Sequence, residues 1–189
     1  MLSATSYSYT RRFAWDLEET FPHVPFPADV NIFAKATRIG AEIRTPETFA
    51  REPVADFHSA RLAGSASGVT LAVPPIGRAF QADGRGGGTV ALQQDQSLRL
   101  VNLPERVWQF AVSDYRVLPR FLAARTGEAL NATLQRAILD VAWRIEELLH
   151  WFDPADDVLA ASILAPLSRL DLGLVVTGTT QAHEVEEEP

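Results

Sequence analysis

The most regular pattern of apolar positions lies in residues 130–152, LNATLQRAILDVAWRIEELLHWF. Apolar side chains recur every three or four residues, at Leu134, Ile138, Val141, Ile145, Leu148 and Phe152. This spacing predicts a long amphipathic helix, with Glu146 and Glu147 on its solvated face. Asp153-Pro154 predicts its end, because proline lacks an amide hydrogen. A shorter helix over residues 155–167 is expected to fold back alongside, giving a helical hairpin.

Two further helices are predicted near the N-terminus. Residues 5–19 place Tyr9, Phe13 and Leu17 on one face, at i, i+4 and i+8. Residues 30–44 carry a second apolar face, with Asp29 as the expected N-cap and Thr45-Pro46 as the end. Three prolines at 22, 25 and 27 make the segment between the helices an extended connector.

The pattern becomes β-like from residue 69 to residue 101. Short apolar runs, VTLAV, GRAFQA, GGTVALQ and SLRLV, are separated by Pro-Pro, Asp-Gly and Gln-Asp-Gln turns. They predict a small antiparallel meander. The glycine cluster at 83–88 is interpreted as a hairpin turn, because it lacks the Lys-Ser/Thr of a phosphate-binding loop and opens a strand. Residues 46–68 have little regular signal and are expected to form a loop.

A change from strand to helix is predicted within residues 107–125, VWQFAVSDYRVLPRFLAAR. Strand-forming residues precede Ser113-Asp114, and helical spacing follows, so Ser113 or Asp114 is the expected helix cap. Trp108 and Phe110 are expected to anchor the end of the sheet. The helix should pack through Tyr115, Leu118 and Leu122, which leaves Arg116 and Arg120 to project.

Together these elements predict an α+β fold with two N-terminal helices, a small antiparallel β meander and a C-terminal helical hairpin. A single domain is expected over residues 1–173, comprising N-terminal helices (5–45), a β region (69–112) and a helical region (115–170). Residues 174–189 are expected to form a disordered acidic tail.

Charge is unevenly distributed along the 189 residues. Residues 1–152 carry 16 basic and 16 acidic side chains, whereas residues 153–189 carry one base and eight acids. The net charge of −7 therefore lies entirely in the last 37 residues, and the remainder can approach a polyanion. The chain has no cysteine and no apolar run long enough to cross a bilayer, so a reducing, cytoplasmic location is expected.

Candidate catalytic chemistry is absent from the sequence. The four histidines (His23, His58, His150 and His183) lack metal-ligand spacing, and no nuclease, helicase or cofactor-binding motif appears. We therefore expect no enzyme activity, no cofactor and no metal. Basic side chains suggest a surface that recognises nucleic acid, since arginine binds phosphates and base edges. Ordinary solvated arginines would give the same pattern. The candidate DNA-binding residues are Arg11, Arg12, Lys35, Arg38, Arg78, Arg85, Arg116, Arg120 and Arg125.

Two blocks resemble the region that follows the methyltransferase core in type ISP restriction–modification enzymes. The first block, residues 3–43, contains Tyr7, Phe13-Ala14-x-x-Leu17, Phe21-Pro22-x-Val24-Pro25 and Phe33. The second, residues 103–125, contains Val107-Trp108 and Tyr115-x-Val117-Leu118. Phe21, Pro22, Pro25, Trp108 and Tyr115 are thus motif residues with an expected structural role. Asp114 stands where the family pattern has glycine, and Phe121 where it has tryptophan.

The resemblance implies a DNA target-recognition domain of a bacterial defence system, without catalytic activity of its own. Its implied partners are double-stranded DNA and an N6-adenine methyltransferase core, in the same chain or in another. Because Met1 lies only two residues before the first block, a detached subunit, a truncated gene product and an expressed fragment all remain open. The alternative is a protein-interaction subunit that docks on a larger partner without reading DNA.

Overall fold

The computed structural model describes residues 25–65, 70–112, 114–168 and 170–173. The helix predicted over residues 5–19, the motif residues Phe21 and Pro22, and the acidic tail lie outside this description. The described part of the chain combines helices with two antiparallel β-sheets, so the predicted α+β class is confirmed. None of the described helices is long and apolar enough to span a membrane.

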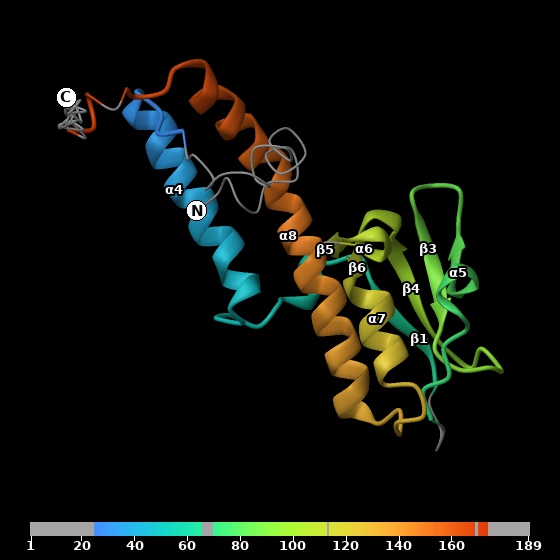
Figure 1. Cartoon of the computed structure of the whole chain (residues 1–189). Coiled ribbons are helices and arrows are strands. Elements are labelled where there is room, and N and C mark those ends of the chain that lie inside the picture. The colour runs from blue at the N-terminus through green and yellow to red at the C-terminus, as the bar shows by residue number, and fades with distance from the viewer. Residues whose placement is uncertain (1–24, 66–69, 113, 169, 174–189) are drawn as a thin grey trace, which may run out of the picture.

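Helix α8 (Ala132–Leu164) is the longest element and runs most of the length of the molecule (Figure 1). Asn131 caps it by accepting a hydrogen bond from the Leu134 amide at 2.9 Å. The helix continues through Pro154, so the predicted break and C-terminal helical hairpin are wrong. Proline removes one hydrogen bond of the helix, but Ala155 and Val158 beyond it are buried against a neighbouring helix, which keeps this part of the chain helical.

That neighbour is α4 (Val30–Glu47), which lies beside the C-terminal half of α8 (Figure 1). The Asp29 carboxylate accepts from the Asn31 amide at 2.7 Å, as the predicted N-cap requires. Ile39 and Ile43 form the buried face. The helix ends at Glu47 rather than before Pro46, because a proline in the last turn disturbs only the carbonyl four residues earlier.

The larger sheet packs near the other half of α8 and has the strand order β1-β4-β3-β2. Its strands, all antiparallel to their neighbours, are β1 (Arg61–Gly64), β2 (Phe80–Ala82), β3 (Gly87–Ala91) and β4 (Leu98–Pro104). The predicted meander and its hairpin at 83–88 are confirmed by β2, β3 and β4. In that turn, the Asp83 carboxylate accepts from the amides of Arg85 and Gly87.

Two predictions in this region are wrong. Residues 46–68 do not form only loop, since they contain a short 3-10 helix (Ala55–Phe57) and edge strand β1. Residues 70–73 form no strand of the sheet; instead the Leu71 amide donates to the Glu128 carbonyl at 2.8 Å, and the Gly127 amide to the Leu71 carbonyl. Both segments are held by contacts distant in sequence, which local patterns do not reveal.

Strand β4 directs two leucines into the core across an irregularity in its pairing. Leu100 and Leu103 are both fully buried although they are three residues apart. The pairing with β3 shifts between Gly88 and Val90, and Asn102 adopts a left-handed φ of 53°. An extra residue in one strand changes which side chains face the core. The main core therefore gathers the sheet, α8 and the segment that follows β4.

That segment begins with α6 (Glu105–Gln109), where a strand was predicted. Trp108 is buried on this helix, with only 3% of its surface exposed, and stacks on Phe80 of β2. Phe110 is partly buried and its ring lies 6.3 Å from that of Phe152 on α8. Trp108 therefore packs on the sheet as expected, although the secondary structure around it was predicted incorrectly, whereas the ring contact of Phe110 is with α8.

Candidate nucleic-acid interface

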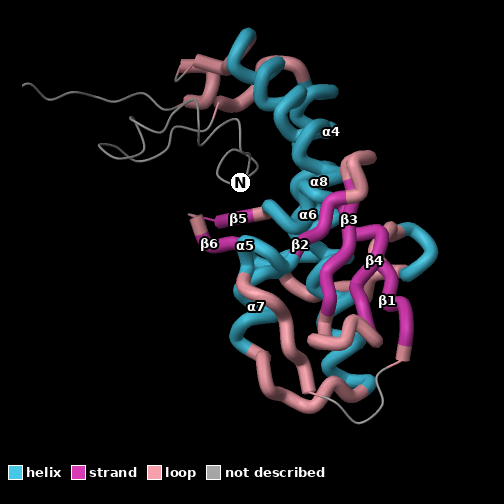
Figure 2. The backbone as a smooth tube through the Cα atoms, turned by 90° about the vertical axis from the view of Figure 1, so that its right-hand side faces the viewer, coloured by secondary structure: helices cyan, strands magenta, loops and turns pink. Residues whose placement is uncertain are grey.

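A two-stranded hairpin leaves the core after Phe110 (Figure 2). It consists of β5 (Ala111–Val112) and β6 (Tyr115–Arg116), in which Val112 pairs with Tyr115. At its base, the Val117 amide donates to the Phe110 carbonyl at 3.1 Å. Helix α7 (Val117–Ala124) follows directly and is fixed to the core by Leu118 and Leu122, both fully buried. A rigid helix therefore supports a protruding hairpin.

The expected cap and packing of α7 need correction. Its N-cap is Arg116, whose side chain makes no capping hydrogen bond, rather than Ser113 or Asp114. Pro119 is the third residue of the helix, where an amide has no partner within the helix. Tyr115 does not pack into the core, because 54% of its surface is exposed. The motif residue Tyr115 thus belongs to the exposed hairpin, whereas Leu118 and Leu122 pack as predicted.

Arg116 and Arg120 both project from this exposed region. Arg116 ends β6 and Arg120 lies one turn into α7, so the two are four residues apart but not on one helix. The Arg120 guanidinium lies 5.9 Å from the centroid of the Tyr115 ring. Among the described residues, neither arginine forms an ion pair. Together with Val112, 58% exposed, they form a surface of cationic, aromatic and apolar groups. We call Val112, Asp114, Tyr115, Arg116 and Arg120 the hairpin surface.

The other candidates do not form one cluster with the hairpin surface. Arg125 follows α7 and places its guanidinium 4.0 Å from the Phe121 ring centroid. Arg85 lies in the β2–β3 turn, and Arg78 on the short helix α5 (Ile76–Ala79). Lys35 and Arg38 lie on α4, which stands at the opposite end of the molecule from α7 in both views (Figures 1 and 2). Arg11 and Arg12 lie outside the described residues.

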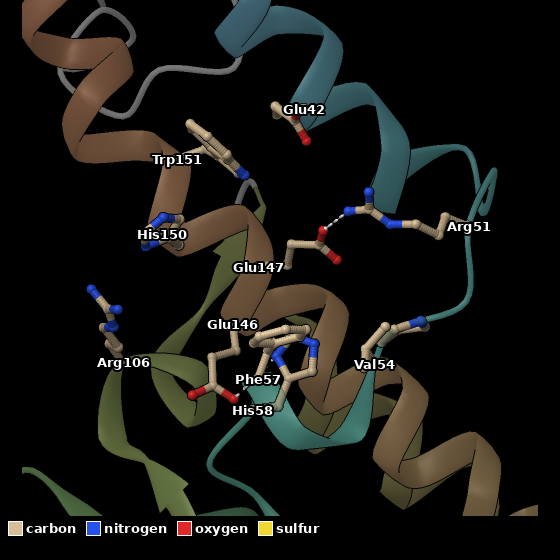
Figure 3. A pocket seen from close by; sticks show the side chains of 11 residues that line it. Glu42, Arg51, Val54, Phe57, His58, Arg106, Glu146, Glu147, His150 and Trp151 are labelled. Carbon is tan, nitrogen blue, oxygen red and sulfur yellow. Dashed lines mark hydrogen bonds and ion pairs between the residues drawn. The ribbon is translucent and has the colours of Figure 1, made fainter.

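A second feature, missed by the sequence analysis, is a cleft of about 540 Å³ beside the middle of α8. Figure 3 shows Arg106 and His150 on one side of it and Arg51 on the other. No local sequence pattern indicates this cleft, because its walls come from α4, the connector after it, α6 and α8. The lining residues are Glu42, Arg51, Pro53, Val54, Phe57, His58, Arg106, Glu146, Glu147, His150 and Trp151.

Two of the three acidic residues that line the cleft, Glu146 and Glu147, form hydrogen bonds or ion pairs within the chain. The Glu146 carboxylate accepts from the Ser59 amide at 3.0 Å and from its hydroxyl at 2.6 Å. Glu147 pairs with Arg51 at 2.5 Å. Both glutamate side chains are only 15% exposed, so the predicted solvated face is wrong here. These bonds fasten the connector of residues 48–60 to α8, and we interpret the cleft as a structural joint.

His58 belongs to the same joint. Its ring stacks on Trp143 with centroids 5.6 Å apart, and its Nδ1 lies 3.7 Å from Glu146. Burial lowers the pKa of His58 below its ordinary value, against the opposing effect of the Glu146 and Glu147 carboxylates. Within the described ranges, no cluster of His, Cys, Asp or Glu could hold a metal ion. His23 and His183 lie outside those ranges.

The described residues form an α+β module with a protruding hairpin and exposed arginines. The comparison with protein families identifies that module more closely. Residues 4–148 match the model of the type ISP C-terminal specificity domain, and the chain belongs to this family. The match includes all but the first residue of the two blocks from which the resemblance was inferred. Comparisons with curated proteins and with solved structures gave no match.

Proposed function

We propose that this chain selects the DNA sequence on which a type ISP restriction–modification enzyme acts, and that it is not catalytic by itself. Membership of the specificity-domain family supports a role in target recognition. In this proposal, an N6-adenine methyltransferase core supplied in the same or another chain extrudes the target adenine into its own pocket. The whole system would then work in the cytoplasm.

The observation that carries the proposal is the pair Arg116 and Arg120 beside the exposed Tyr115. Two exposed guanidinium groups that form no ion pair with any described residue suit contacts with phosphates on a duplex, which fix the orientation of a protein on DNA. A two-stranded β-ribbon also fits the major groove. Arg125 and Arg85 are secondary candidates, since neither belongs to the hairpin surface. Lys35 and Arg38 would require a separate contact with DNA.

The test measures binding of duplex DNA by fluorescence anisotropy at several salt concentrations. We expect weak binding by the isolated chain, since few phosphates are neutralised. The double variant Arg116→Ala/Arg120→Ala should weaken binding and reduce the slope of log K against log salt by roughly 2, at about 0.9 per phosphate contact. The matched control is Arg44→Ala/Arg136→Ala, which removes two exposed cations elsewhere. An equal effect of both double variants would overturn the assignment to the hairpin surface.

A second candidate function is docking on a larger partner without reading DNA. It is favoured by exposed apolar side chains on the connector after α4, of which Phe57, at 83%, is the most exposed. A methyltransferase core of a type ISP enzyme is the partner to test. Binding of the chain to that core, lost in Phe57→Ser, together with no detectable DNA binding in low salt, would establish this function instead.

A further inference from the structure

We infer that Asp114 reads a base by accepting a hydrogen bond from an exocyclic amino group in the major groove. This inference rests on the proposed function and adds a specificity-determining residue to it. Asp114 occupies the turn between β5 and β6 and is exposed. Its backbone φ is 64°, in the left-handed region.

The position of Asp114 favours contact with base edges. The hairpin surface projects from the core, and residues 111, 112, 114, 115 and 116 are all exposed. The support beneath is rigid, because α7 is held by the buried Leu118 and Leu122. A ribbon of two strands can enter the major groove with its turn foremost, while side chains at its base remain near the phosphates. Asp114 then lies deepest in the major groove, and Arg116 and Arg120 remain nearer the phosphates of the DNA backbone.

The charge of Asp114 restricts what it can bind. Within the described part of the chain it forms no ion pair with either arginine, and Arg120 faces the Tyr115 ring instead. A carboxylate is repelled by phosphates and accepts hydrogen bonds without donating any. In the major groove only cytosine N4 and adenine N6 donate hydrogen bonds. Guanine O6 and N7 and thymine O4 are acceptors, so they cannot form a hydrogen bond with the carboxylate.

Asp114 therefore favours an amino-bearing base at one position of the site. Cytosine is the preferred partner, because aspartate and glutamate accept from its N4 in known modes of direct readout. The expected discrimination against the wrong base is roughly ten-fold or more. Its arginine neighbours add affinity for any sequence, so the carboxylate contributes selectivity rather than strength.

Three substitutions separate base reading from turn formation. Asparagine and glycine both tolerate a left-handed φ, so Asp114→Asn and Asp114→Gly should keep the hairpin. Asn carries a donor as well as an acceptor and pairs best with adenine. Gly removes the contact altogether. The control is Glu128→Gln, which removes an exposed carboxylate beyond the far end of α7.

The experiment selects duplexes from a randomised pool with the purified chain in low salt and sequences the bound fraction. Wild type and Glu128→Gln should enrich one common site. Asp114→Gly should lose base preference at a single position of that site, and Asp114→Asn should shift that position toward adenine. Circular dichroism checks that each variant is folded.

The outcomes distinguish the two proposals. If wild type enriches a site and both Asp114 variants enrich the same site unchanged, Asp114 does not read a base, while target recognition by this chain stands. If wild type enriches no sequence although it binds DNA, or binds none, then the proposed function itself fails. A variant that loses preference at every position equally would show that the hairpin as a whole, not the carboxylate, determines selectivity, and the inference on Asp114 would be withdrawn.

Discussion

Trp108 of α6 stacks on Phe80 of β2, with ring centroids 5.8 Å apart and ring planes inclined by 15°. This contact joins the larger sheet to the segment that carries the hairpin surface. Trp108→Ala should lower the free energy of unfolding by about 3–5 kcal/mol, because it leaves a large cavity in the core. Urea denaturation measures this loss, and a loss below about 1 kcal/mol would contradict a scaffold role.

Tyr115, the other aromatic motif residue of this block, should behave in the opposite way. It is exposed on the hairpin, so Tyr115→Ala should change the stability by no more than about 0.5 kcal/mol. It should nevertheless weaken DNA binding, since the ring contacts Arg120 and helps to position it. Thermal melts and anisotropy of the same preparation check both effects. Unchanged DNA affinity would remove Tyr115 from the proposed interface.

The elements that were predicted correctly are those specified by patterns within a short stretch of sequence, such as apolar periodicity and helix caps. The apolar stripe from Leu134 to Phe152 and the Asp29 cap correspond to observed features of α8 and α4. Proline did not end a helix where tertiary packing stabilised the residues beyond it. Pro154 lies within α8 because the chain beyond it packs on α4, and its missing hydrogen bond costs less than that burial contributes.

The candidate site was predicted in part. Arg116 and Arg120 are exposed, as the periodicity after residue 115 indicated. The hairpin itself was missed, since strands of two residues are too short to produce a period. The family pattern contained one usable signal. Its glycine at the position of Asp114 fits a turn with positive φ, which the structure has there.

Asp114 should therefore show an unusual order of stabilities. At a left-handed φ of 64°, Asp114→Gly should be about 1 kcal/mol more stable than Asp114→Ala, because alanine pays a steric cost there. Gly77 provides the control. It lies on α5 with no atom near its missing Cβ and no positive φ, so Gly77→Ala should be neutral or stabilising. Denaturant midpoints check the order, and an alanine variant as stable as glycine at 114 would contradict it.

Arg144 of α8 is a buried polar residue that contacts the end of α4 and the connector after it. It is 7% exposed, donates to Asp140 at 2.8 Å and to the Arg51 carbonyl at 3.0 Å, and lies 4.3 Å from the Phe49 ring centroid. Arg144→Ala should cost about 2–4 kcal/mol, because it leaves partly buried acceptors unpaired.

The control for Arg144 is Arg136→Ala on the same helix. Arg136 pairs with Glu52 at 2.6 Å, but both side chains are more than three-quarters exposed, and such pairs contribute little. Chemical denaturation should separate the two variants by more than about 1 kcal/mol. Similar losses in both would show that the contacts of Arg144 do not fasten the joint.

His58 should make the stability of the joint depend on pH. Burial against Trp143 lowers its pKa in the folded chain, and Arg61 acts in the same direction, while Glu146 and Glu147 oppose this shift. Below the unfolded value of about 6.5, the unfolded chain binds more protons at this site than the folded chain does. The contribution of His58 to stability is therefore complete above about pH 6.5 and decreases as the pH falls toward the lowered pKa of the folded state.

His58→Phe keeps a ring beside Trp143 and removes the titration, so its melting temperature should fall less than that of wild type between pH 7.5 and pH 5.5. His150→Phe, at an exposed histidine, controls for the loss of an imidazole. Parallel decreases in wild type and His58→Phe would show that His58 does not govern this pH dependence.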